Sequence, residues 1–375
     1  MRTCDVLVVG GGIAGSSAAY ELAAARDVVL VERETRPGYH STGRSAALFT
    51  ETYGNAVIRA LTTGSKPFYL SPPPCFSDHP VLTPRGALLV ARADQADLLD
   101  GAFREMSATG AKVRRLDRQE VRSIIPVIRG DYVAGGIHEP DAMDLDVHSI
   151  HQGYLRGLRA RGGMILTDAG VVSVTRRGGR WLVDTPGTSF SAATLVNAAG
   201  AWADVVAGLG GVRPIGLIPK RRSVFTFEAP EGSQFRTWPA VIDLEETFYF
   251  KPDAGVLLGS PANEDAVLPH DVQPEEIDIA LGISRIEEAT TLTVPRIRSR
   301  WAGLRSFVAD KTLVAGFDPG SPGFFWLAGQ GGYGIQTAPA MARITAASVL
   351  GESFPRDLSA LGLNPSLLAP DRLRS

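Results

Sequence analysis

The chain has 375 residues, of which 44% are hydrophobic and 21% are charged, and its formal net charge is −2. This length exceeds the size at which a single core usually stops growing, so we expect two domains. The near-neutral charge argues against nucleic acid or an anionic membrane as a partner. The two cysteines, Cys4 and Cys75, exclude a disulfide scaffold and a cysteine-cluster metal site and favour a cytoplasmic protein.

Targeting segments and metal motifs do not stand out either. The short apolar run at the N-terminus contains Asp5, so it does not resemble a signal peptide, and no stretch approaches the ~18 apolar residues of a membrane helix. We therefore expect no integral membrane segment, while peripheral contact with a membrane stays open. The six histidines are scattered, and only His148 and His151 are three residues apart, without acidic or cysteine companions at ligand spacing. We expect no metal site.

The first forty residues carry the clearest pattern in the chain. Residues 5–9 read as a buried strand, residues 10–15 are Gly-Gly-Gly-Ile-Ala-Gly, and residues 16–25 are rich in helix-forming residues. A second apolar strand follows over residues 28–31 and ends in Glu32. This strand–turn–helix–strand unit with a terminal acid is typical of dinucleotide binding.

Each part of this unit has a physical role in that interpretation. Gly10 permits the tight turn, Gly12 lets the backbone approach a pyrophosphate at the helix N-terminus, and Gly15 lets helix and strand pack closely. Glu32 can accept hydrogen bonds from a ribose hydroxyl. The alternative, a glycine-rich turn in an ordinary βαβ unit, leaves Glu32 unexplained. The unit alone does not distinguish NAD from FAD.

The next stretch, residues 41–47, is small, polar and glycine-containing. Its backbone N–H groups and hydroxyls could bind a second part of a long cofactor, or it could be a flexible surface loop. Residues 80–145 are expected to lie outside the dinucleotide domain. Before and within them we predict helices over residues 55–68, 94–106 and 117–125, the last begun by a capping box at Asp117 and Glu120, and strands within 81–91 and over 132–137.

Residues 146–200 return to an alternating pattern. Asp146 is expected to cap a helix that ends at Arg161 before two glycines. Strands follow over residues 164–167, 171–175, 180–185 and 193–197. The last of these runs into Ala198-Ala199-Gly200-Ala201-Trp202, where small residues allow a ligand to approach the backbone.

Residues 220–310 are predicted to form an antiparallel sheet that covers the cofactor. Its strands are expected at residues 223–227, 240–244, 247–251 and 256–258, with a helix over 274–289. The basic cluster Lys220-Arg221-Arg222 is read more simply as a solvated strand end than as an anion site. The chain closes with strands at 312–316 and 324–328, a glycine-rich turn at 329–334 and a helix over 335–350, whose N-terminus favours negative charge.

The three glycine-bearing strand ends, at residues 10–15, 196–202 and 329–337, together resemble the D-amino-acid oxidase–sarcosine oxidase family of FAD proteins. Within that family the resemblance is closer to the bacterial D-arginine dehydrogenases and extends along essentially the whole chain. The stretches that carry it are residues 37–47, 151–157, 219–223, 251–255, 301–310 and 330–337.

The resemblance implies an α/β protein bound to FAD. A Rossmann-like FAD-binding domain of the glutathione-reductase type would comprise residues 1–80, 146–215 and 311–375. A second, α+β substrate domain built on an antiparallel sheet would comprise residues 81–145 and 216–310. No cysteine matches the family's attachment sites, which implies non-covalent FAD. The implied cofactor residues are Gly10, Gly12, Ile13, Ala14, Gly15, Glu32, Arg33, Ser41, Thr42, Gly43, Arg44, Ser45, Ala47, Val171, Gly200, Trp202, Gly303, Gly331, Gly332, Tyr333, Gly334, Ile335, Gln336 and Thr337.

The resemblance also implies the substrate-binding residues. Arg222, Tyr249 and Arg305 match residues that bind a substrate α-carboxylate, and a guanidinium–carboxylate fork would fix the substrate Cα–H against flavin N5. Tyr53 matches a tyrosine that closes over the site, and Gly332 matches a carbonyl that accepts from the substrate amine. This resemblance favours the anion-site interpretation of Arg222.

Two positions depart from the arginine enzymes. Ala87 stands where their glutamate receives the substrate guanidinium, and Leu48 replaces a loop histidine. Without the acid, the preference for a cationic side chain falls by about ten- to a hundred-fold, since a charge-assisted bond contributes ~1.5–3 kcal/mol. Leu48, Ala87, Ala240 and Ile242 would then form an apolar pocket for the substrate side chain. The acids that could substitute for the missing glutamate are Glu51, Asp243 and Glu245.

The sequence therefore predicts oxidative deamination of a small α-amino acid of D configuration with a neutral or apolar side chain. Hydride transfer from Cα to flavin N5 would give an imino acid, and water would convert it to a 2-oxo acid and ammonia. The alternatives are oxidation of an N-methyl or other secondary amine, oxidation of a 2-hydroxy acid, and a non-catalytic flavoprotein. We expect a dehydrogenase, with an oxidase not excluded. The acceptor, quinone or oxygen, and the oligomeric state are left open.

Overall fold

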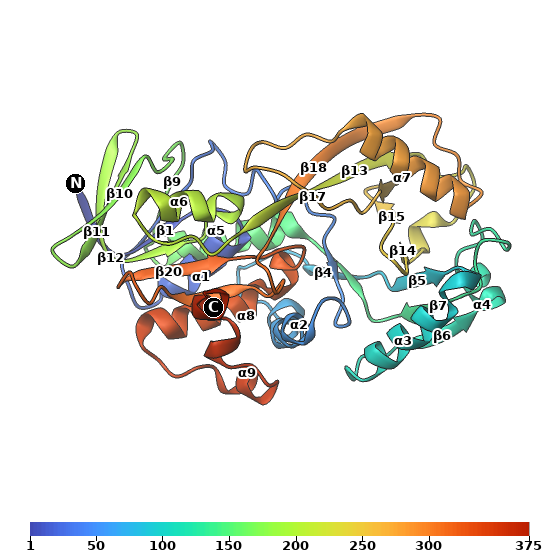
Figure 1. Ribbon diagram of the computed structural model, residues 1–375, viewed down its shortest axis with the longest axis horizontal. Helices are drawn as coiled ribbons and strands as arrows, with labels where there is room; N and C mark the ends of the chain where they lie inside the picture. The colour runs from blue at the N-terminus through green and yellow to red at the C-terminus, as the bar shows by residue number, and fades with distance from the viewer. Residues whose placement is uncertain (375) are drawn as a thin grey trace.

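The computed structural model describes residues 1–374 and contains two large β-sheets with a small sheet between them (Figure 1). The first large sheet has eight strands. They are β1 (Arg2–Val9), β2 (Val28–Val31), β9 (Met164–Leu166), β10 (Ser173–Arg177), β11 (Arg180–Thr185), β12 (Thr188–Asn197), β19 (Val314–Phe317) and β20 (Phe324–Ala328). The core of this sheet is parallel in the order β20-β12-β1-β2-β9, and β10, β11 and β19 add to it as antiparallel strands.

Helices cover both faces of the parallel core, which explains why β2 and β20 are apolar at every position. One face packs against α1 (Ile13–Leu22) and α8 (Gly334–Leu350), and the other against α6 (Ala203–Leu209). Three further helices extend the α1–α8 side, namely α2 (Ala56–Leu70), α5 (Val147–Ala160) and α9 (Arg356–Ala360). In Figure 1 this α/β unit occupies the left and lower part of the molecule.

The second large sheet has nine strands. They are β5 (Ala87–Ala91), β6 (Arg114–Asp117), β7 (Gly135–Glu139), β13 (Ile218–Phe227), β14 (Ala240–Asp243), β15 (Tyr249–Asp253), β16 (Val256–Ser260), β17 (Asp265–Ala266) and β18 (Ile297–Phe307). The helices α4 (Arg118–Ile124) and α7 (Glu276–Ala289) pack on one face of this sheet, whereas α3 (Ala96–Ser107) packs on the opposite face against Ala91 and Ile137; all three lie to the right in Figure 1. Short 3₁₀ turns complete the chain as η1 (Ala93–Gln95), η2 (Gly200–Trp202), η3 (Phe235–Thr237), η4 (Pro365–Leu367) and η5 (Pro370–Leu373).

The second sheet is antiparallel, as predicted, except for one pair of strands. β5 and β14 pair in parallel, with Ala87 opposite Ala240. About 150 residues separate these two strands in the sequence, so no hairpin connects them and antiparallel pairing is not imposed. This parallel pair joins the two segments of the chain, residues 87–139 and 218–307, that build the sheet.

A three-stranded sheet lies between the two large ones and consists of β3 (Leu48–Phe49), β4 (Leu82–Pro84) and β8 (Met143–Leu145). Asp144 fastens it to the nine-stranded sheet, because its carboxylate accepts from Lys251 Nζ at 2.7 Å and from Arg85 Nε at 2.7 Å. β3 belongs to the first predicted segment of the cofactor domain, whereas β4 and β8 belong to the predicted substrate domain. The domain boundaries at residues 80 and 145 therefore stay a prediction.

Several local predictions can be compared with the structure directly. The strand at residues 324–328 coincides with β20. The capping box is present, since Glu120 N donates to Asp117 Oδ1 and Asp117 N donates to Glu120 Oε2, both at 2.9 Å. The strand predicted from residue 132 begins only at Gly135, because Val133 N donates to Arg129 O at 3.1 Å in a helical turn.

Two further observations concern the same described residues. None of the helices within residues 1–374 is long and apolar enough to cross a membrane. Those residues also contain no cluster of three or more His, Cys, Asp or Glu side chains that could hold a metal ion.

Candidate active site

Two adjoining cavities lie at the carboxyl ends of the parallel strands. The larger, of about 600 Å³, runs from Glu32 past the start of α1 to Gly331. The smaller, of about 100 Å³, lies between the N-terminus of α8 and the nine-stranded sheet. Both cavities are lined by Ile13, Ser41, Thr42, Leu304, Gln330 and Gly331. A long ligand could therefore extend from one cavity into the other.

The glycines of the opening turn are required by close packing. Gly10 has φ = +106°, and a Cβ at this position would lie 2.4 Å from the carbonyl oxygen of Ala198. A Cβ on Gly15 would lie 1.9 Å from the carbonyl oxygen of Gly10. Gly12 lies at the N-cap of α1 without a side-chain cap and lines the larger cavity. Ile13 N, in the first turn, donates to Thr42 Oγ1 at 3.0 Å, and the helix N-terminus borders this cavity.

Glu32 is buried at the end of β2 and lines the same cavity. Its Oε2 accepts from Gly11 N at 2.7 Å and its Oε1 accepts from Glu34 N at 2.9 Å. Each carboxylate oxygen has a second acceptor position. Glu32 can therefore hold the turn in place and still accept from a ribose hydroxyl.

Aromatic and cationic groups line the far end of the larger cavity. The Arg33 guanidinium lies 4.6 Å from the centre of the Trp202 ring, and the His40 ring lies 4.7 Å from the same centre. Val171 and Gly200 also line this end. The exposed apolar side chains of Val172, Val205 and Leu209 continue the lining, which gives a surface suited to a flat aromatic base.

Two residues of the stretch 41–47, Ser41 and Arg44, attach it to the nine-stranded sheet and to the loop before α7. Ser41 Oγ donates to Leu304 O at 2.6 Å, and Trp301 Nε1 donates to Arg44 O at 3.1 Å. Arg44 Nη1 donates to Val272 O and Ala302 O, both at 3.0 Å, and its Nη2 pairs with Asp271. The Arg44 guanidinium therefore acts as an anchor for a segment whose residues Ser41, Thr42 and Ser45 line the cavities.

The glycine-rich turn before α8 separates the two cavities. Gly331 has φ = +52°, and a Cβ there would lie 2.5 Å from the Phe307 ring, while a Cβ on Gly332 would lie 2.9 Å from Arg305 Nη1. Gln330 lines both cavities, and its buried Nε2 has no hydrogen-bond partner among the described residues. An unpaired buried amide donor at a junction of cavities indicates a ligand acceptor at that point.

Some of the predicted cofactor residues have other neighbours. Gln336 Nε2 donates to Thr62 Oγ1 at 2.9 Å, and Thr337 Oγ1 donates to Tyr333 O at 2.9 Å. Within the described chain, six of the predicted cofactor residues line neither cavity: Gly15, Gly43, Ala47, Tyr333, Gln336 and Thr337. A direct contact with the cofactor stays a prediction for these six.

Strand register brings the predicted substrate residues together. Directly opposite residues point to the same face of a sheet, and successive residues alternate between faces. Arg222 is opposite Gly303, and Lys220, two residues before it, is opposite Arg305. Phe225 is opposite Gly259, which is also opposite Phe250. Phe225 and Phe250 therefore lie on one face of the sheet. Arg222, Tyr249 and Arg305 lie on the other face.

This shared face, which we call the substrate face, looks towards α8. The smaller cavity is lined there by Arg222, Val224, Tyr249, Gly303 and Arg305, and from the α8 side by Gly332, Gly334 and Ile335. The opposite face carries Phe225, Phe250, Val241 and Leu88, which are buried against α7 and α4. The alternation of polar and aromatic residues along β13 and β15 thus separates a site from a core.

The two arginines differ in their contacts. Arg222 is buried, its Nε donates to Asn263 O at 2.8 Å, and its Nη2 pairs with Glu264 Oε1 at 3.2 Å. Burial lowers the pKa of Arg222, and the nearby charge of Arg305 lowers it further. Arg305 Nη1 donates to Tyr53 Oη at 3.3 Å. Burial raises the pKa of Tyr53, which keeps its hydroxyl protonated and able to donate in turn.

The predicted apolar pocket is assembled only in part. Ala87 lies opposite both Ala240 and Glu139, and Ile242 lies opposite Tyr249, so these side chains share the substrate face. Leu48 is opposite Asp144 in the small sheet. Among the described residues, the lining of the smaller cavity does not include these four predicted side chains, Leu48, Ala87, Ala240 and Ile242. Their role as the substrate pocket stays a prediction.

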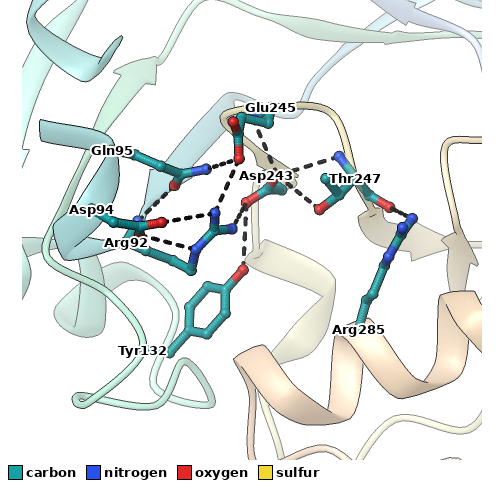
Figure 2. A network of polar contacts seen from close by, with 8 residues as sticks. All are labelled: Arg92, Asp94, Gln95, Tyr132, Asp243, Glu245, Thr247 and Arg285. Atoms are coloured by element: carbon teal, nitrogen blue, oxygen red, sulfur yellow. Dashed lines mark hydrogen bonds and ion pairs between the residues drawn. The ribbon is translucent and has the colours of Figure 1, made fainter. Parts of the chain in front are cut away.

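The three candidate substitute acids are engaged elsewhere. Figure 2 shows Asp243 and Glu245 in a polar network with Arg92. Thr247 Oγ1 donates to Asp243 at 2.8 Å, and Gln95 Nε2 donates to Glu245 at 2.7 Å. Asp243 follows Ile242 on β14 and so points to the opposite face of the sheet.

Glu51, the third acid, pairs with Lys66 and accepts from Thr63 Oγ1 at 3.0 Å. The acid nearest to Ala87 in the register is instead Glu139, which is buried. Sequence reasoning missed both Glu139 and Gln330. Gln330 lies inside the glycine-rich turn that was recognised, whereas no sequence signal marked Glu139.

Comparison with known families decides the identity of this fold. Residues 5–348 match the model of the DAO family, described as FAD dependent oxidoreductase. The chain belongs to the DAO family.

Individual members of the family are similar over different lengths. FAD-dependent oxidoreductase domain-containing protein 1 of Xenopus laevis is 24% identical over 93% of this chain and 80% of its own length. Mitochondrial dimethylglycine dehydrogenase of Rattus norvegicus is 28% identical over 68% of this chain, but the match spans only 30% of that protein. Glycine oxidase from Geobacillus kaustophilus has a similar structure, with a TM-score of 0.82, 20% identity, and coverage of 94% of this chain and 96% of that one.

The DAO fold and its FAD cofactor agree with the geometry of the site. A Cβ on Gly10 or Gly15 would clash with backbone carbonyl oxygens. The N-cap residue of α1, Gly12, has no side chain that could fill the space beside the larger cavity. Gln330 supplies an unpaired buried donor between the cavities. Gly12, Glu32 and Trp202 would hold the adenosine diphosphate half of FAD, and Gln330 and the turn before α8 would hold the flavin half.

Proposed function

We propose that this DAO-family protein catalyses the FAD-dependent oxidative deamination of a small α-amino acid, of D configuration and with a neutral or apolar side chain. The observation that carries the proposal is the convergence of Arg222, Tyr249 and Arg305 on one sheet face, around a cavity that adjoins the cofactor cavity. A protein that only binds FAD has no need of two cationic groups at that position.

The protein's own residues would bind and orient the substrate. Arg305 and Arg222, helped by the Tyr249 hydroxyl, would hold the α-carboxylate by charge-assisted hydrogen bonds, and the Gly332 carbonyl would accept from the amine. Tyr53, with its hydroxyl protonated, would close the cavity beside Arg305. FAD, when bound, accepts two electrons and the α-hydrogen from the substrate. The released imino acid would hydrolyse in water to the 2-oxo acid and ammonia.

The preference for a neutral side chain rests on the acids around the cavity. Ala87 is buried beside Ala240. The acid opposite Ala87, Glu139, accepts from Glu51 N and Thr52 Oγ1, and the candidate substitutes Glu51, Asp243 and Glu245 are also bound to other groups of the protein. A cationic side chain would be desolvated there without a free partner. In this respect the chain differs from the arginine enzymes that its sequence resembles. We also propose the domain division at residues 80, 145, 215 and 310.

An N-methyl or other secondary amine is the second candidate. It is supported by the similarity to dimethylglycine dehydrogenase, whose name describes an N-methylated amino acid as substrate. An α-carboxylate is common to both substrate classes, so the same arginine pair would serve. The product distinguishes them, since a primary amine gives ammonia and an N-methyl amine gives formaldehyde.

The experiment is anaerobic mixing of the FAD-loaded protein with single compounds while the flavin absorbance is followed. The panel contains D- and L-methionine, D-leucine, D-arginine, sarcosine and D-lactate, and turnover is then measured with oxygen or an artificial acceptor. Reduction by D-methionine and D-leucine with release of ammonia is expected. A clear preference for D-arginine would contradict the side-chain argument, and no reduction by any member would contradict the catalytic proposal.

A further inference from the structure

The segment that carries Tyr53, residues 50–54, connects β3 to α2, and Tyr53 contacts Arg305, which lines the smaller cavity. The segment's attachments to α2 are local: Glu51 pairs with Lys66, and Gly54 O accepts from Arg59 Nε at 2.8 Å. It also meets the start of α8, where Thr50 N donates to Gln336 Oε1 at 3.4 Å and the Tyr53 ring lies 5.0 Å from the Tyr333 ring. Its attachments to the nine-stranded sheet are few. Arg305 donates to the Tyr53 hydroxyl at 3.3 Å, and Glu139, at the end of β7, provides the remaining ones.

Glu139 makes two hydrogen bonds to this segment. Its Oε1 accepts from Glu51 N at 3.0 Å, and its Oε2 accepts from Thr52 Oγ1 at 2.6 Å. The residue is only 2% exposed. A carboxylate buried this deeply is costly unless its acceptors are used, and both oxygens are used on the two residues that precede Tyr53.

The two attachments respond differently to a substrate. Arg305 lines the smaller cavity, so a substrate carboxylate that binds Arg305 competes with the Tyr53 hydroxyl for the same guanidinium. Glu139 is not among the described residues that line that cavity. Its bonds to Glu51 and Thr52 are therefore available whether or not the guanidinium is occupied.

We propose that Glu139 is a positioning residue that holds the Tyr53 segment on the nine-stranded sheet and so keeps the substrate cavity closed around a bound amino acid. The proposal rests on the proposed function, because it assigns the segment to the same substrate site. Around Glu139, Lys66 is the nearby cation and Glu51 the nearby acid that act on its charge, and burial raises its pKa.

The test compares Glu139→Ala, Glu139→Gln and Asp141→Asn in the FAD-loaded protein. Alanine removes both bonds. Glutamine keeps one acceptor for Glu51 N, and its amide can donate to the Thr52 hydroxyl, which can reverse its role. Asp141 is the matched control, because it is a half-exposed acid two residues further along whose partner is Lys112 at 3.5 Å.

The first readout is hydrogen–deuterium exchange of the peptide covering residues 48–56 without any substrate. We expect exchange in Glu139→Ala to be about ten-fold faster or more than in the wild type, and Glu139→Gln and Asp141→Asn to stay within about three-fold. Exchange in Glu139→Ala at the wild-type rate would overturn the proposal. If this variant does not fold, Thr52→Val removes one of the two bonds at nearly constant volume, and wild-type exchange in that variant would overturn the proposal equally.

The second readout is turnover of D-methionine. A roughly ten-fold rise in KM with a smaller change in kcat is expected for Glu139→Ala, with rescue by glutamine. Faster exchange without any change in KM would overturn the link to cavity closure. If the wild type itself does not oxidise D-methionine, the proposed function fails on that substrate, while the exchange readout still decides whether Glu139 holds the segment.

Discussion

The cofactor cavity and the substrate face differ in the groups that form them, which are backbone atoms in the first and side chains in the second. The cofactor cavity is formed largely by backbone: glycines at residues 10, 12 and 331, the start of α1, and Glu32 bound to two N–H groups. The substrate face is formed by long side chains, Arg222, Tyr249 and Arg305, that project from three separate strands. A backbone site depends on steric room, whereas a side-chain site depends on strand register and on charge.

The two regions should therefore fail in different ways. A change in the backbone site has no alternative rotamer, so it should abolish FAD binding or folding. A change on the substrate face should leave the flavin in place and alter only what is bound next to it. The following predictions test this distinction, from the largest expected effect to the smallest.

Gly15→Ala should cause the largest loss. Its Cβ would lie 1.9 Å from the carbonyl oxygen of Gly10, so α1 and the opening turn cannot both keep their positions. We expect insoluble protein or protein without flavin, measured by yield and by the flavin-to-protein absorbance ratio. Gly101→Ala is the matched control, since nothing lies within 4 Å of a Cβ there, and it should stabilise α3 by up to ~1 kcal/mol. A Gly15→Ala protein with full flavin content would contradict the backbone interpretation.

Arg305→Met should come next and should spare FAD binding. Each charge-assisted bond to a carboxylate contributes ~1.5–3 kcal/mol. If the variant loses two such bonds, kcat/KM for the best substrate of the panel should fall by about a hundredfold or more. Arg222→Met should have a smaller effect, because Arg222 already pairs with Glu264 and Asn263. Arg300→Met is the control, as this arginine lies on the same strand with a half-exposed side chain. Equal losses in all three variants would refute a specific carboxylate site.

Asp271→Asn should affect how long FAD is retained. Asp271 pairs with Arg44 and accepts from the Tyr39 hydroxyl at 3.3 Å, so it fastens the segment at residues 39–44 over the larger cavity. Since Asp271 is partly exposed, we expect a modest effect, a few-fold faster release of FAD at unchanged kcat, followed by flavin fluorescence after dilution. Glu276→Gln, an exposed acid near Arg300, should release FAD at the wild-type rate. Unchanged release in Asp271→Asn would show that the Arg44–Asp271 pair is dispensable.

His151 should give the smallest effect, visible as a pH dependence. Burial lowers the pKa of His151 below its ordinary value of 6.5, and its Nε2 lies 2.8 Å from the carbonyl oxygen of Gly11. A lowered pKa means that the unfolded chain takes up the proton first. The contribution to stability is therefore complete above pH 6.5 and is lost as pH falls from 6.5 through the folded-state pKa. The free energy of unfolding, measured with denaturant at pH 7.5 and 5.5, should fall more for the wild type than for His151→Asn. An equal fall in both proteins would contradict this assignment.

The same contrast explains what sequence reasoning achieved. The opening turn, the strand at 324–328 and the turn before α8 were predicted correctly because glycine spacing and apolar runs are local in the chain. The one parallel pair in the second sheet was not predicted, because the pairing of Ala87 with Ala240 joins segments that are far apart in sequence. The acids Glu51, Asp243 and Glu245 could not be placed for a similar reason, since their partners come from other elements.

The sequence by itself determined the dinucleotide turn and the FAD family, and it singled out Arg222 and Arg305 as candidate substrate residues. Only the tertiary structure decided that Arg44 anchors a segment, that Asp243 faces away from the site, and that Glu139 takes up the position beside Ala87. The physical reason is the range of the interactions. Glycine spacing and apolar runs can be read from residues that are neighbours in the chain. The face on which a strand residue points, and the partner that it meets there, are set by register with strands from distant parts of the chain.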